Sequence, residues 1–353
     1  MRQPRILLAT ALGAALSVPL ALPATAATGA PRPARLSWEI EPTGSTARLR
    51  GLAAVSRDVA WTSGSAGTVL RTTNGGRTWR NVAPPGTGDL EFRDVEAFDA
   101  DNAVLLSIGE GEASRIYRTS DGGRSWDLTF RNDDPRAFYD CVAFSGRRRG
   151  LAVSDPVDGR FRMLSTRDGG RSWKVLPSAG MPQALPGEFA FAASGQCLVA
   201  KGRDFWLASG GGAQARVFHS RDQGLTWTVS ASPLPSSEAQ GIFALAFRDA
   251  RHGIAVGGDY RPDVPSPDAT ATTADAGRRW VLAPRPPESY RSGAAWLQGF
   301  AAIAVGPTGS DVSLDGGRTW RRFDTGSFDT VDCTSHGACW ASGEQGRVAR
   351  LRS

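Results

Sequence analysis

Hydrophobic residues along this chain occur in short runs separated by Gly, Asp, Asn and Ser. Residues 94–130 show the pattern, because DVEAF, AVLLSIG, RIYRTS and SWDLTF follow one another with polar turns between them. Runs of this length, rich in β-branched, aromatic and aliphatic residues, are typical of β-strands. No apolar spacing of three and four residues is sustained after residue 26. The pattern therefore predicts an all-β protein with four short antiparallel strands in each unit.

One octapeptide recurs six times at the end of these units. Its copies are TTNGGRTW, TSDGGRSW, TRDGGRSW, SRDQGLTW, TADAGRRW and SLDGGRTW, and the steps between their final Trp residues are 47, 47, 54, 53 and 40 residues. A signature repeated at such a period marks a protein built from one supersecondary unit per repeat. Four short strands per period are typical of a β-propeller blade.

The octapeptide suits a hairpin between the third and fourth strands of each blade. Its acidic or amide residue can accept backbone N–H groups within the turn, its Gly residues supply positive φ, and its Trp can pack between neighbouring sheets. We therefore assign structural roles to Asn74, Asp121, Asp168, Asp222, Asp275, Asp315, Trp79, Trp126, Trp173, Trp227, Trp280 and Trp320.

The number of blades follows from the two ends of the repeat region. After Trp320 the chain supplies three more strands and then stops, whereas LSWEIEP near residue 38 repeats the Ser/Thr-Trp of the octapeptides. Pairing the strand of Trp38 with the last three strands would close the ring and leave no unpaired edge. We therefore predict a seven-bladed propeller whose last blade is completed by an N-terminal strand. The alternative is six blades followed by an unstructured tail.

The N-terminus predicts export. Arg2 and Arg5 precede an apolar run and Ala24-Thr25-Ala26, which is the order of a secretory signal peptide. We expect a signal peptide over residues 1–26, a short linker over 27–35 and a single propeller over 36–353. The apolar run contains Pro19, which favours cleavage over an uncleaved anchor. The mature protein is then periplasmic or secreted, with no transmembrane segment, and we expect a monomer.

Charge and cysteines refine this picture only slightly. The formal net charge is +6, too small and too dispersed over 353 residues to indicate nucleic-acid binding. Cys333 and Cys339 flank the turn TSHGA, so we predict a disulfide between them. Cys141 and Cys197 either pair in the same way or are simply small buried residues.

Candidate chemistry lies on the face of the propeller opposite the octapeptides. That face receives the longer loops between second and third strands and the connections between blades, and such loops on a rigid scaffold commonly carry function. The residues there that we expect to bind a ligand at the mouth of the central channel are Arg93, Glu96, Arg136, Tyr139, Asp140, Glu188, Asp259, Tyr260, Tyr290, Arg291 and Glu344. Polar loop residues are often only solvated, so each of them also has a structural interpretation.

The sequence does not place at this mouth the residues that most enzyme classes need. His219, His252 and His336 all fall near the octapeptide face, which disfavours a Ser-His-Asp triad or a histidine metal site. We expect no catalytic residues, no metal and no cofactor. A glycosidase remains the alternative, with Glu96 and Asp140 as one possible pair of carboxylates.

The octapeptides resemble the Asp-boxes, or bacterial neuraminidase repeats, of sialidases, sortilin and xyloglucanases. The early Phe/Tyr-Arg-Ile-Pro motif of sialidases is missing, and seven blades differ from the sialidase six. The whole of residues 36–352 is similar to the photosystem II stability and assembly-factor propellers. That resemblance implies a non-catalytic assembly protein that docks on a protein partner through an Arg-rich face, for which Arg50, Arg93, Arg136 and Arg291 would be a partial equivalent. A carbohydrate-active enzyme or lectin is the second hypothesis.

Overall fold

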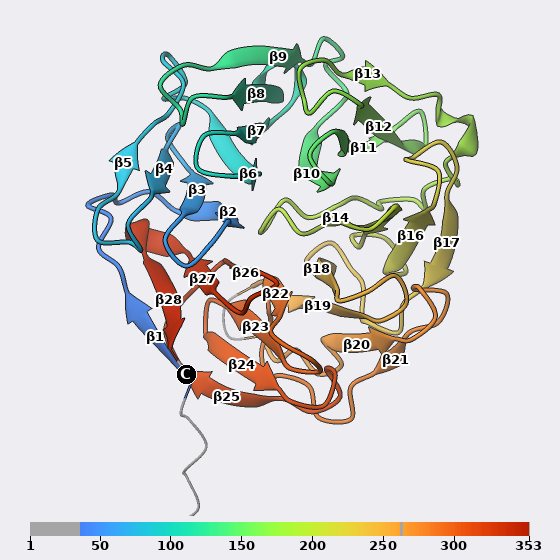
Figure 1. The fold of residues 1–353 in the computed structure, drawn as a ribbon. Coiled ribbons are helices and arrows are strands. Elements are labelled where there is room, and N and C mark those ends of the chain that lie inside the picture. The colour runs from blue at the N-terminus through green and yellow to red at the C-terminus, as the bar shows by residue number, and fades with distance from the viewer. Residues whose placement is uncertain (1–35, 262–263, 353) are drawn as a thin grey trace, which may run out of the picture. The chain divides into compact units, whose positions relative to one another are not determined.

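The computed structural model describes residues 36–261 and 264–352. The expected signal peptide and linker, residues 1–26 and 27–35, lie outside the described residues. Within the described chain, seven four-stranded antiparallel sheets are arranged in a ring, with one strand of each sheet nearest the centre (Figure 1). The prediction of an all-β, seven-bladed propeller is confirmed.

Each of the first three blades is built from four consecutive strands, counted from the centre outwards. Blade 1 contains β2 (Leu49–Ala54), β3 (Ala60–Gly64), β4 (Val69–Thr72) and β5 (Arg80–Asn81). Blade 2 contains β6 (Glu91–Ala97), β7 (Ala103–Ile108), β8 (Arg115–Thr119) and β9 (Asp127–Arg131), with the 3-10 turn η1 (Gly111–Ala113). Blade 3 contains β10 (Tyr139–Ser145), β11 (Arg149–Val157), β12 (Arg160–Thr166) and β13 (Lys174–Val175).

The next three blades repeat this order. Blade 4 follows the 3-10 turn η2 (Ser178–Gly180) and contains β14 (Leu198–Lys201), β15 (Asp204–Ala208), β16 (Arg216–Ser220) and β17 (Thr228–Ala231). Blade 5 contains β18 (Gln240–Phe247), β19 (Gly253–Asp259), β20 (Thr270–Thr273) and β21 (Val281–Leu282). Blade 6 contains β22 (Gly293–Trp296), β23 (Ala302–Gly306), β24 (Gly309–Ser313) and β25 (Arg321–Asp324).

The seventh blade joins the two ends of the described chain. It contains β26 (Thr330–Cys333), β27 (Cys339–Ser342), the 3-10 turn η3 (Glu344–Gly346) and β28 (Val348–Arg352), and β1 (Ser37–Ile40) pairs antiparallel with β28. Trp38 lies opposite Leu351 in this pairing and packs against Phe323 and Phe328. Its indole Nε1 donates a 2.9 Å hydrogen bond to Ser310 Oγ of blade 6. The predicted closing strand is therefore present.

The octapeptides form the hairpins between the third and fourth strands, and the same two hydrogen bonds recur in all six. The first-position hydroxyl accepts the backbone N–H four residues later, at 3.0 Å for Thr119 and Gly123. The third-position side chain accepts the N–H of the seventh residue, at 3.0 Å for Asp121 and Ser125. These bonds fix the turn without help from the rest of the sheet.

Five of the hairpins also bond to the turn between the first and second strands of their own blade. Gly122 N, for example, donates to Asp101 O at 2.9 Å, and the fourth residue of four other octapeptides does the same. Both kinds of turn therefore lie on one face of the ring. The loops between second and third strands and the blade connections consequently lie on the other face.

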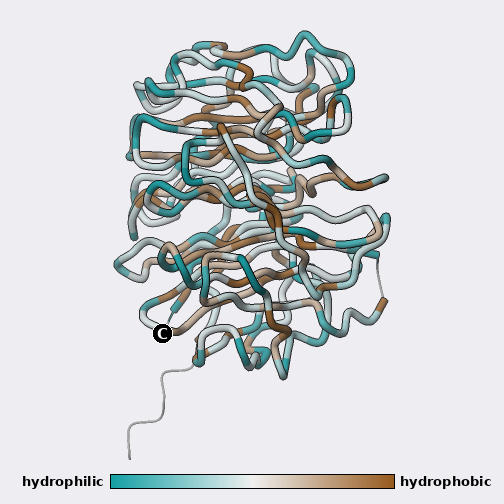
Figure 2. The backbone as a smooth tube through the Cα atoms, turned by 90° about the vertical axis from the view of Figure 1, so that its right-hand side faces the viewer, coloured by the Kyte–Doolittle hydropathy of each residue, from teal (hydrophilic) through white to brown (hydrophobic). Residues whose placement is uncertain are grey.

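Apolar side chains between neighbouring blades make up the core. Trp126 of blade 2 meets Trp61 of blade 1 edge to face with ring centroids 6.2 Å apart, and its Nε1 donates to Val82 O. Figure 2 shows hydrophobic stretches within the strands and hydrophilic residues concentrated towards the loops. The core therefore runs round the ring between the sheets.

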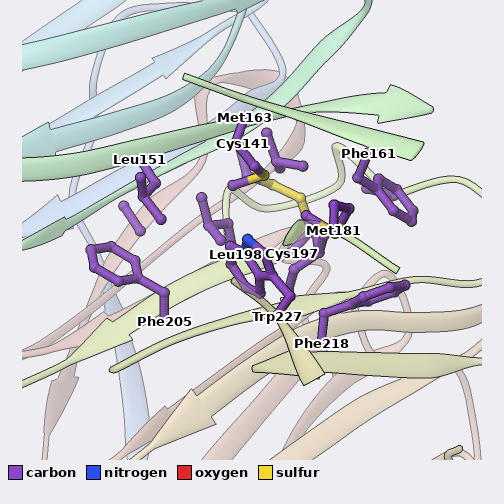
Figure 3. Packing of buried hydrophobic residues seen from close by; sticks show 14 residues of the cluster. Cys141, Leu151, Phe161, Met163, Met181, Cys197, Leu198, Phe205, Phe218 and Trp227 are labelled. Atoms are coloured by element: carbon purple, nitrogen blue, oxygen red, sulfur yellow. A yellow bond between two sulfur atoms is a disulfide. The ribbon is translucent and has the colours of Figure 1, made fainter. Parts of the chain in front are cut away.

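Two disulfides are present, and the described residues contain no free cysteine. Cys333 pairs with Cys339 across the β26–β27 turn. Cys141 pairs with Cys197 and links β10 of blade 3 to the start of blade 4, inside the cluster of buried residues drawn in Figure 3. The alternative that the sequence left open for Cys141 and Cys197 is thus decided in favour of pairing. Disulfides are typical of proteins in oxidising compartments.

The closing strand generates a direct stability prediction. Trp38→Ala removes a large ring that is 8 % exposed, so we expect it to lower the free energy of unfolding by about 3–5 kcal/mol. Ile40→Ala on the same strand is the matched control, because Ile40 is 46 % exposed and its loss should cost less than about 1 kcal/mol. Equilibrium urea denaturation measures both, and equal losses would show that β1 does not hold the ring closed.

Candidate functional site

The innermost strands of four blades carry a one-residue β-bulge near their first residues. The register shifts between Leu49 and Gly51, between Phe92 and Asp94, between Tyr139 and Cys141, and between Ile242 and Ala244. A bulge leaves its extra residue out of the ladder and redirects that side chain. The extra residues are Arg50, Arg93, Asp140 and Phe243.

All four bulge residues line one cavity of about 580 Å³. This mouth cavity lies on the face opposite the octapeptides, where the inner strands begin. Its basic residues are Arg48, Arg50 and Arg93, its acidic residues are Asp140, Asp155 and Asp329, and its aromatic residues are Phe138, Phe189, Phe191, Phe243, Tyr260 and Tyr290. It therefore combines both charges with a large apolar wall, which is a composition typical of a binding site.

Residues 191–197, which we name the crossover segment, lie across the channel beneath the mouth cavity. The chain before β14 reaches from blade 4 towards the middle of the ring (Figure 1). Gln196 accepts from Ala294 N of blade 6 at 2.8 Å and donates to Val331 O of blade 7 at 2.9 Å. Arg93 Nη1 of blade 2 donates to Ala192 O at 2.9 Å. These bonds to three other blades give the mouth cavity a fixed floor.

The aromatic residues form one continuous cluster above this floor. Phe191 of the crossover segment stacks on Phe243 with ring centroids 3.8 Å apart. Phe189 meets Phe191 at 4.8 Å, and Tyr290 meets the other side of Phe243 at 4.7 Å, both edge to face. Burial raises the pKa of the Tyr290 hydroxyl, which therefore stays neutral.

The three arginines of the cavity differ in how well they are paired. Arg48 donates from Nε and Nη2 to the carboxylate of Asp329, at 2.9 and 2.7 Å. Arg50 Nε lies 3.9 Å from the same carboxylate, and this buried Nε has no hydrogen-bond acceptor among the described residues. Burial, together with the positive charge of Arg93, lowers the pKa of Arg50 to about 10. Arg50 is therefore a guanidinium that an incoming anion would stabilise.

Asp140 and Asp155 form a pair of carboxyl groups that share a proton. Asp140 is 2 % exposed, and no N–H or hydroxyl of the described residues donates to its Oδ2. Burial and then the neighbouring charge of Asp155 raise the pKa of Asp140 well above its ordinary value. Burial also raises the pKa of Asp155 to about 7, although Asp155 Oδ1 accepts Ala190 N at 2.9 Å. When Asp140 is protonated it can donate to Asp155, and its Oδ2 still accepts no hydrogen bond from the described residues.

Of the residues expected at the mouth, the structure brings four together: Arg93, Asp140, Tyr260 and Tyr290 line the cavity. Tyr139 does not, because the bulge turns Asp140 to the channel while Tyr139 is fully buried against Phe130 between blades. Glu96 lies further along β6 beside Asp94 and Asp332, whose charges add to burial in raising its pKa.

The remaining five expected residues are engaged in ion pairs outside the cavity. Arg136 is exposed and bonds to Asp134 and Asp158, and Glu344 lies 3.1 Å from Arg48 at the rim. Glu188, Asp259 and Arg291 are buried and bond to Arg216, Arg261 and Asp311. Their loops are polar because of these pairs, which stabilise the blade connections.

Our sequence-based list lacked Arg48, Asp155 and four phenylalanines of the cavity: Phe138, Phe189, Phe191 and Phe243. Arg50 was named only through the resemblance to the assembly-factor propellers. A signal for the bulge residues exists, since LRG, FRD, YDC and IFA each insert one residue between buried neighbours at equivalent points of four blades. Aligning the inner strands rather than the octapeptides would have found them. No comparable signal marks Phe189 and Phe191, because blade 4 departs from the repeat there.

We also searched the described part of the chain for metal ligands, membrane-spanning helices and histidines near the mouth cavity. No three His, Cys, Asp or Glu side chains gather there in an arrangement that could hold a metal ion. None of the helices described is long and apolar enough to span a bilayer. His252 and His336 lie in first-to-second strand turns, away from the mouth cavity.

Comparison with known proteins establishes the fold. No protein-family model matches the chain, and no curated protein matches it. One similar solved structure is YCF48 bound to D1 peptide, which is 17% identical over 90% of this chain and 95% of its own, with a TM-score of 0.63. Another is YCF48 from Cyanidioschyzon merolae, which is 16% identical over 89% of this chain and 98% of its own, with a TM-score of 0.63. A GH74 xyloglucanase from Xanthomonas campestris is 15% identical over 89% of this chain and 53% of its own, with a TM-score of 0.62. Identities this low show a common fold and nothing further.

The unequal pairing of Arg48 and Arg50 predicts opposite effects on stability. Arg48→Met should lower the free energy of unfolding by about 1–3 kcal/mol, because it leaves the buried carboxylate of Asp329 without its two hydrogen bonds. Arg50→Met should leave stability unchanged or raise it, since it relieves repulsion with Arg93 and removes a buried donor without an acceptor. Urea denaturation of both variants checks this. A large loss for Arg50→Met would mean that Arg50 is a structural residue.

The carboxyl pair predicts a pH dependence. In the unfolded chain both groups ionise near their ordinary pKa of about 4, whereas the folded protein keeps their protons to higher pH. The folded state thus binds more protons, and the pair's contribution to the free energy of unfolding falls as pH rises from about 4 through about 7. Asp140→Asn retains a donor to Asp155 but cannot ionise. Its stability relative to the native protein should therefore rise between about pH 5 and about pH 8, by at most about 1.4 kcal/mol per pH unit.

The matched control for this prediction is Asp158→Asn. Asp158 lies in the β11–β12 turn, three residues after Asp155, and its side chain is 75% exposed. Urea denaturation across the pH range should show a constant difference for Asp158→Asn. A constant difference for Asp140→Asn as well would contradict the shared proton.

Proposed function

We propose that this protein is an exported, non-enzymatic binding or assembly propeller that takes an extended segment of a protein partner into its mouth cavity. The observation that carries the proposal is Arg50, a half-buried guanidinium whose buried Nε has no acceptor, beside Arg93 and the aromatic cluster. Arg50 and Arg93 suit a carboxylate of the partner, and the aromatic wall suits its apolar side chains. Tyr260 at the rim is 51% exposed and extends this wall outwards.

Three further observations support a peptide ligand and export. The sequence resembles photosystem II assembly-factor propellers with Asp-box repeats, and one structure of the same fold is YCF48 bound to D1 peptide. Two disulfides accord with an oxidising compartment, as does the signal peptide that the sequence predicts. We expect a monomer that uses neither metal nor cofactor. The hydrogen bonds that hold the crossover segment form the cavity floor before a ligand binds, and such preorganisation lowers the entropic cost of binding.

A carbohydrate-active enzyme or lectin is the second candidate, favoured by the xyloglucanase of similar fold and by the acidic pair in the cavity. The two carboxyls of a glycosidase lie about 5–9.5 Å apart, on either side of the bond they cleave. Asp140 and Asp155 interact so closely that the charge of Asp155 raises the pKa of Asp140, which disfavours two carboxyls on opposite sides of a bond to be cleaved. Glu96 and Asp140, the pair considered from sequence, are not brought together in the cavity.

The test is binding of the purified protein to an array of short synthetic peptides. We expect the peptides that bind to carry a carboxylate next to apolar residues. Arg50→Gln should weaken their binding by about tenfold or more, which is the contribution of one charged hydrogen bond to affinity. Arg136→Gln is the matched control, because Arg136 is an exposed arginine of the same face that lies outside the cavity.

Two results would overturn the proposal. One is an array without any peptide whose binding depends on Arg50. The other is hydrolysis of fluorogenic glycosides that Asp140→Asn abolishes, which would establish the second candidate.

A further inference from the structure

Four buried carboxylates around the mouth of the channel are each neutralised by an arginine of this chain. Glu188 accepts from Arg216 Nε at 2.9 Å, and Asp311 accepts from Arg291 Nε at 2.7 Å. Asp259 accepts from Arg261 Nε at 2.9 Å, and Asp329 is bound by Arg48. Such pairing is expected, since an isolated buried charge is costly.

The pair Asp140 and Asp155 has no such arginine. Among the described residues no arginine, lysine or histidine nitrogen lies within 4.0 Å of either carboxyl. Asp140 is 2 % exposed, and its Oδ2 receives no hydrogen bond from an N–H or a hydroxyl group. Both residues line the mouth cavity. Because no basic side chain of this protein pairs with the two carboxyls, a cation of a ligand could bind there.

The surroundings of the pair suit a compact cation on an alkyl chain. Phe138 and Phe189 line the cavity with the pair. Asp155 N donates to Phe138 O at 3.0 Å, and the residue after Phe189, Ala190, donates its N–H to Asp155 Oδ1. Aromatic rings favour cations by cation–π attraction and also pack against methylene groups. The charged group nearest to Asp140 from a neighbouring strand is Arg93 of β6, which suits an anion instead.

We propose that Asp140 and Asp155 form an ammonium subsite of the mouth cavity, which holds a primary amine of the bound peptide. The inference rests on the proposed function and adds the second charge that the peptide must carry. The amine is a lysine side chain or a free N-terminus. When it binds, it donates to both carboxyls, and the proton that they shared leaves to solvent. A metal ion suits the pair poorly, because Ca²⁺ takes six to eight oxygen ligands.

The experiment uses the full chain and a library of N-acetylated octapeptide amides. Lysine, norleucine or arginine occupies each position of the peptide in turn. A second position carries glutamate or glutamine. A parallel set carries a free N-terminus and no lysine. Binding is measured by fluorescence polarisation for the native protein, Asp140→Asn, Asp158→Asn and Arg50→Gln.

We expect a lysine peptide, or a free N-terminus, to bind about tenfold or more tightly than its norleucine or acetylated counterpart, as one charged hydrogen bond would give. Asp140→Asn should abolish that preference and retain the preference for glutamate over glutamine. Arg50→Gln should do the reverse, and Asp158→Asn should change neither. The preference that each of these two variants retains also shows that the variant is folded.

The failures are distinguishable. Equal binding of lysine and norleucine peptides, with the glutamate preference intact, would overturn the ammonium subsite and leave the proposed function standing. A lysine preference that survives Asp140→Asn would place the amine elsewhere and overturn the assignment. A stronger preference for arginine than for lysine would overturn the choice of an ammonium ion. Absence of binding by every peptide would overturn the proposed function and the subsite together.

Discussion

The pairing of β1 with β28 is the constraint on which the rest of the structure depends. Each blade buries its faces only against its two neighbours, so an open ring would expose one face of a sheet at each end. The residues around the mouth cavity come from all seven blades: Arg50, Arg93, Asp140, Phe191, Phe243, Tyr290 and Asp329. A site assembled in this way exists only when the ring is closed.

Repetition alone would give a symmetric channel, and two local departures from the repeat make it asymmetric. The bulges bring a different side chain to the channel from each of four inner strands, although the strands themselves are equivalent. In blade 4 the crossover segment that precedes β14 lies across the channel. The disulfide from Cys197 to Cys141 ties the end of this segment to blade 3. The scaffold thus stays regular while its centre becomes specific.

The sequence predicted the scaffold well because the scaffold is encoded locally. Each octapeptide carries its own turn-forming hydrogen bonds, and Trp38 carries enough of the motif to identify the closing strand. The site was predicted only in part, because side-chain direction depends on the register between strands. One bulge exchanges the positions of Tyr139 and Asp140, and no property of either residue alone reveals which one faces the channel. The partners of Glu188 and Arg291 likewise come from other strands, so their pairing was not visible in the sequence.

The charged residues of the mouth region therefore fall into two groups. Some are paired with other residues of this protein, and others lack a hydrogen-bond partner. Arg291 is fully buried, yet it bonds to Asp311, Thr308 and its neighbouring carbonyl, so its contribution is to stability. Arg50 and Asp140 occupy bulges that direct them into the cavity, where one lacks an acceptor and the other lacks a donor. Folding alone does not favour such groups, because a buried polar atom without a partner costs about 1–3 kcal/mol. Both residues line the mouth cavity, where a ligand that carries an anion and a cation would supply the acceptor that Arg50 lacks and the donor that Asp140 lacks.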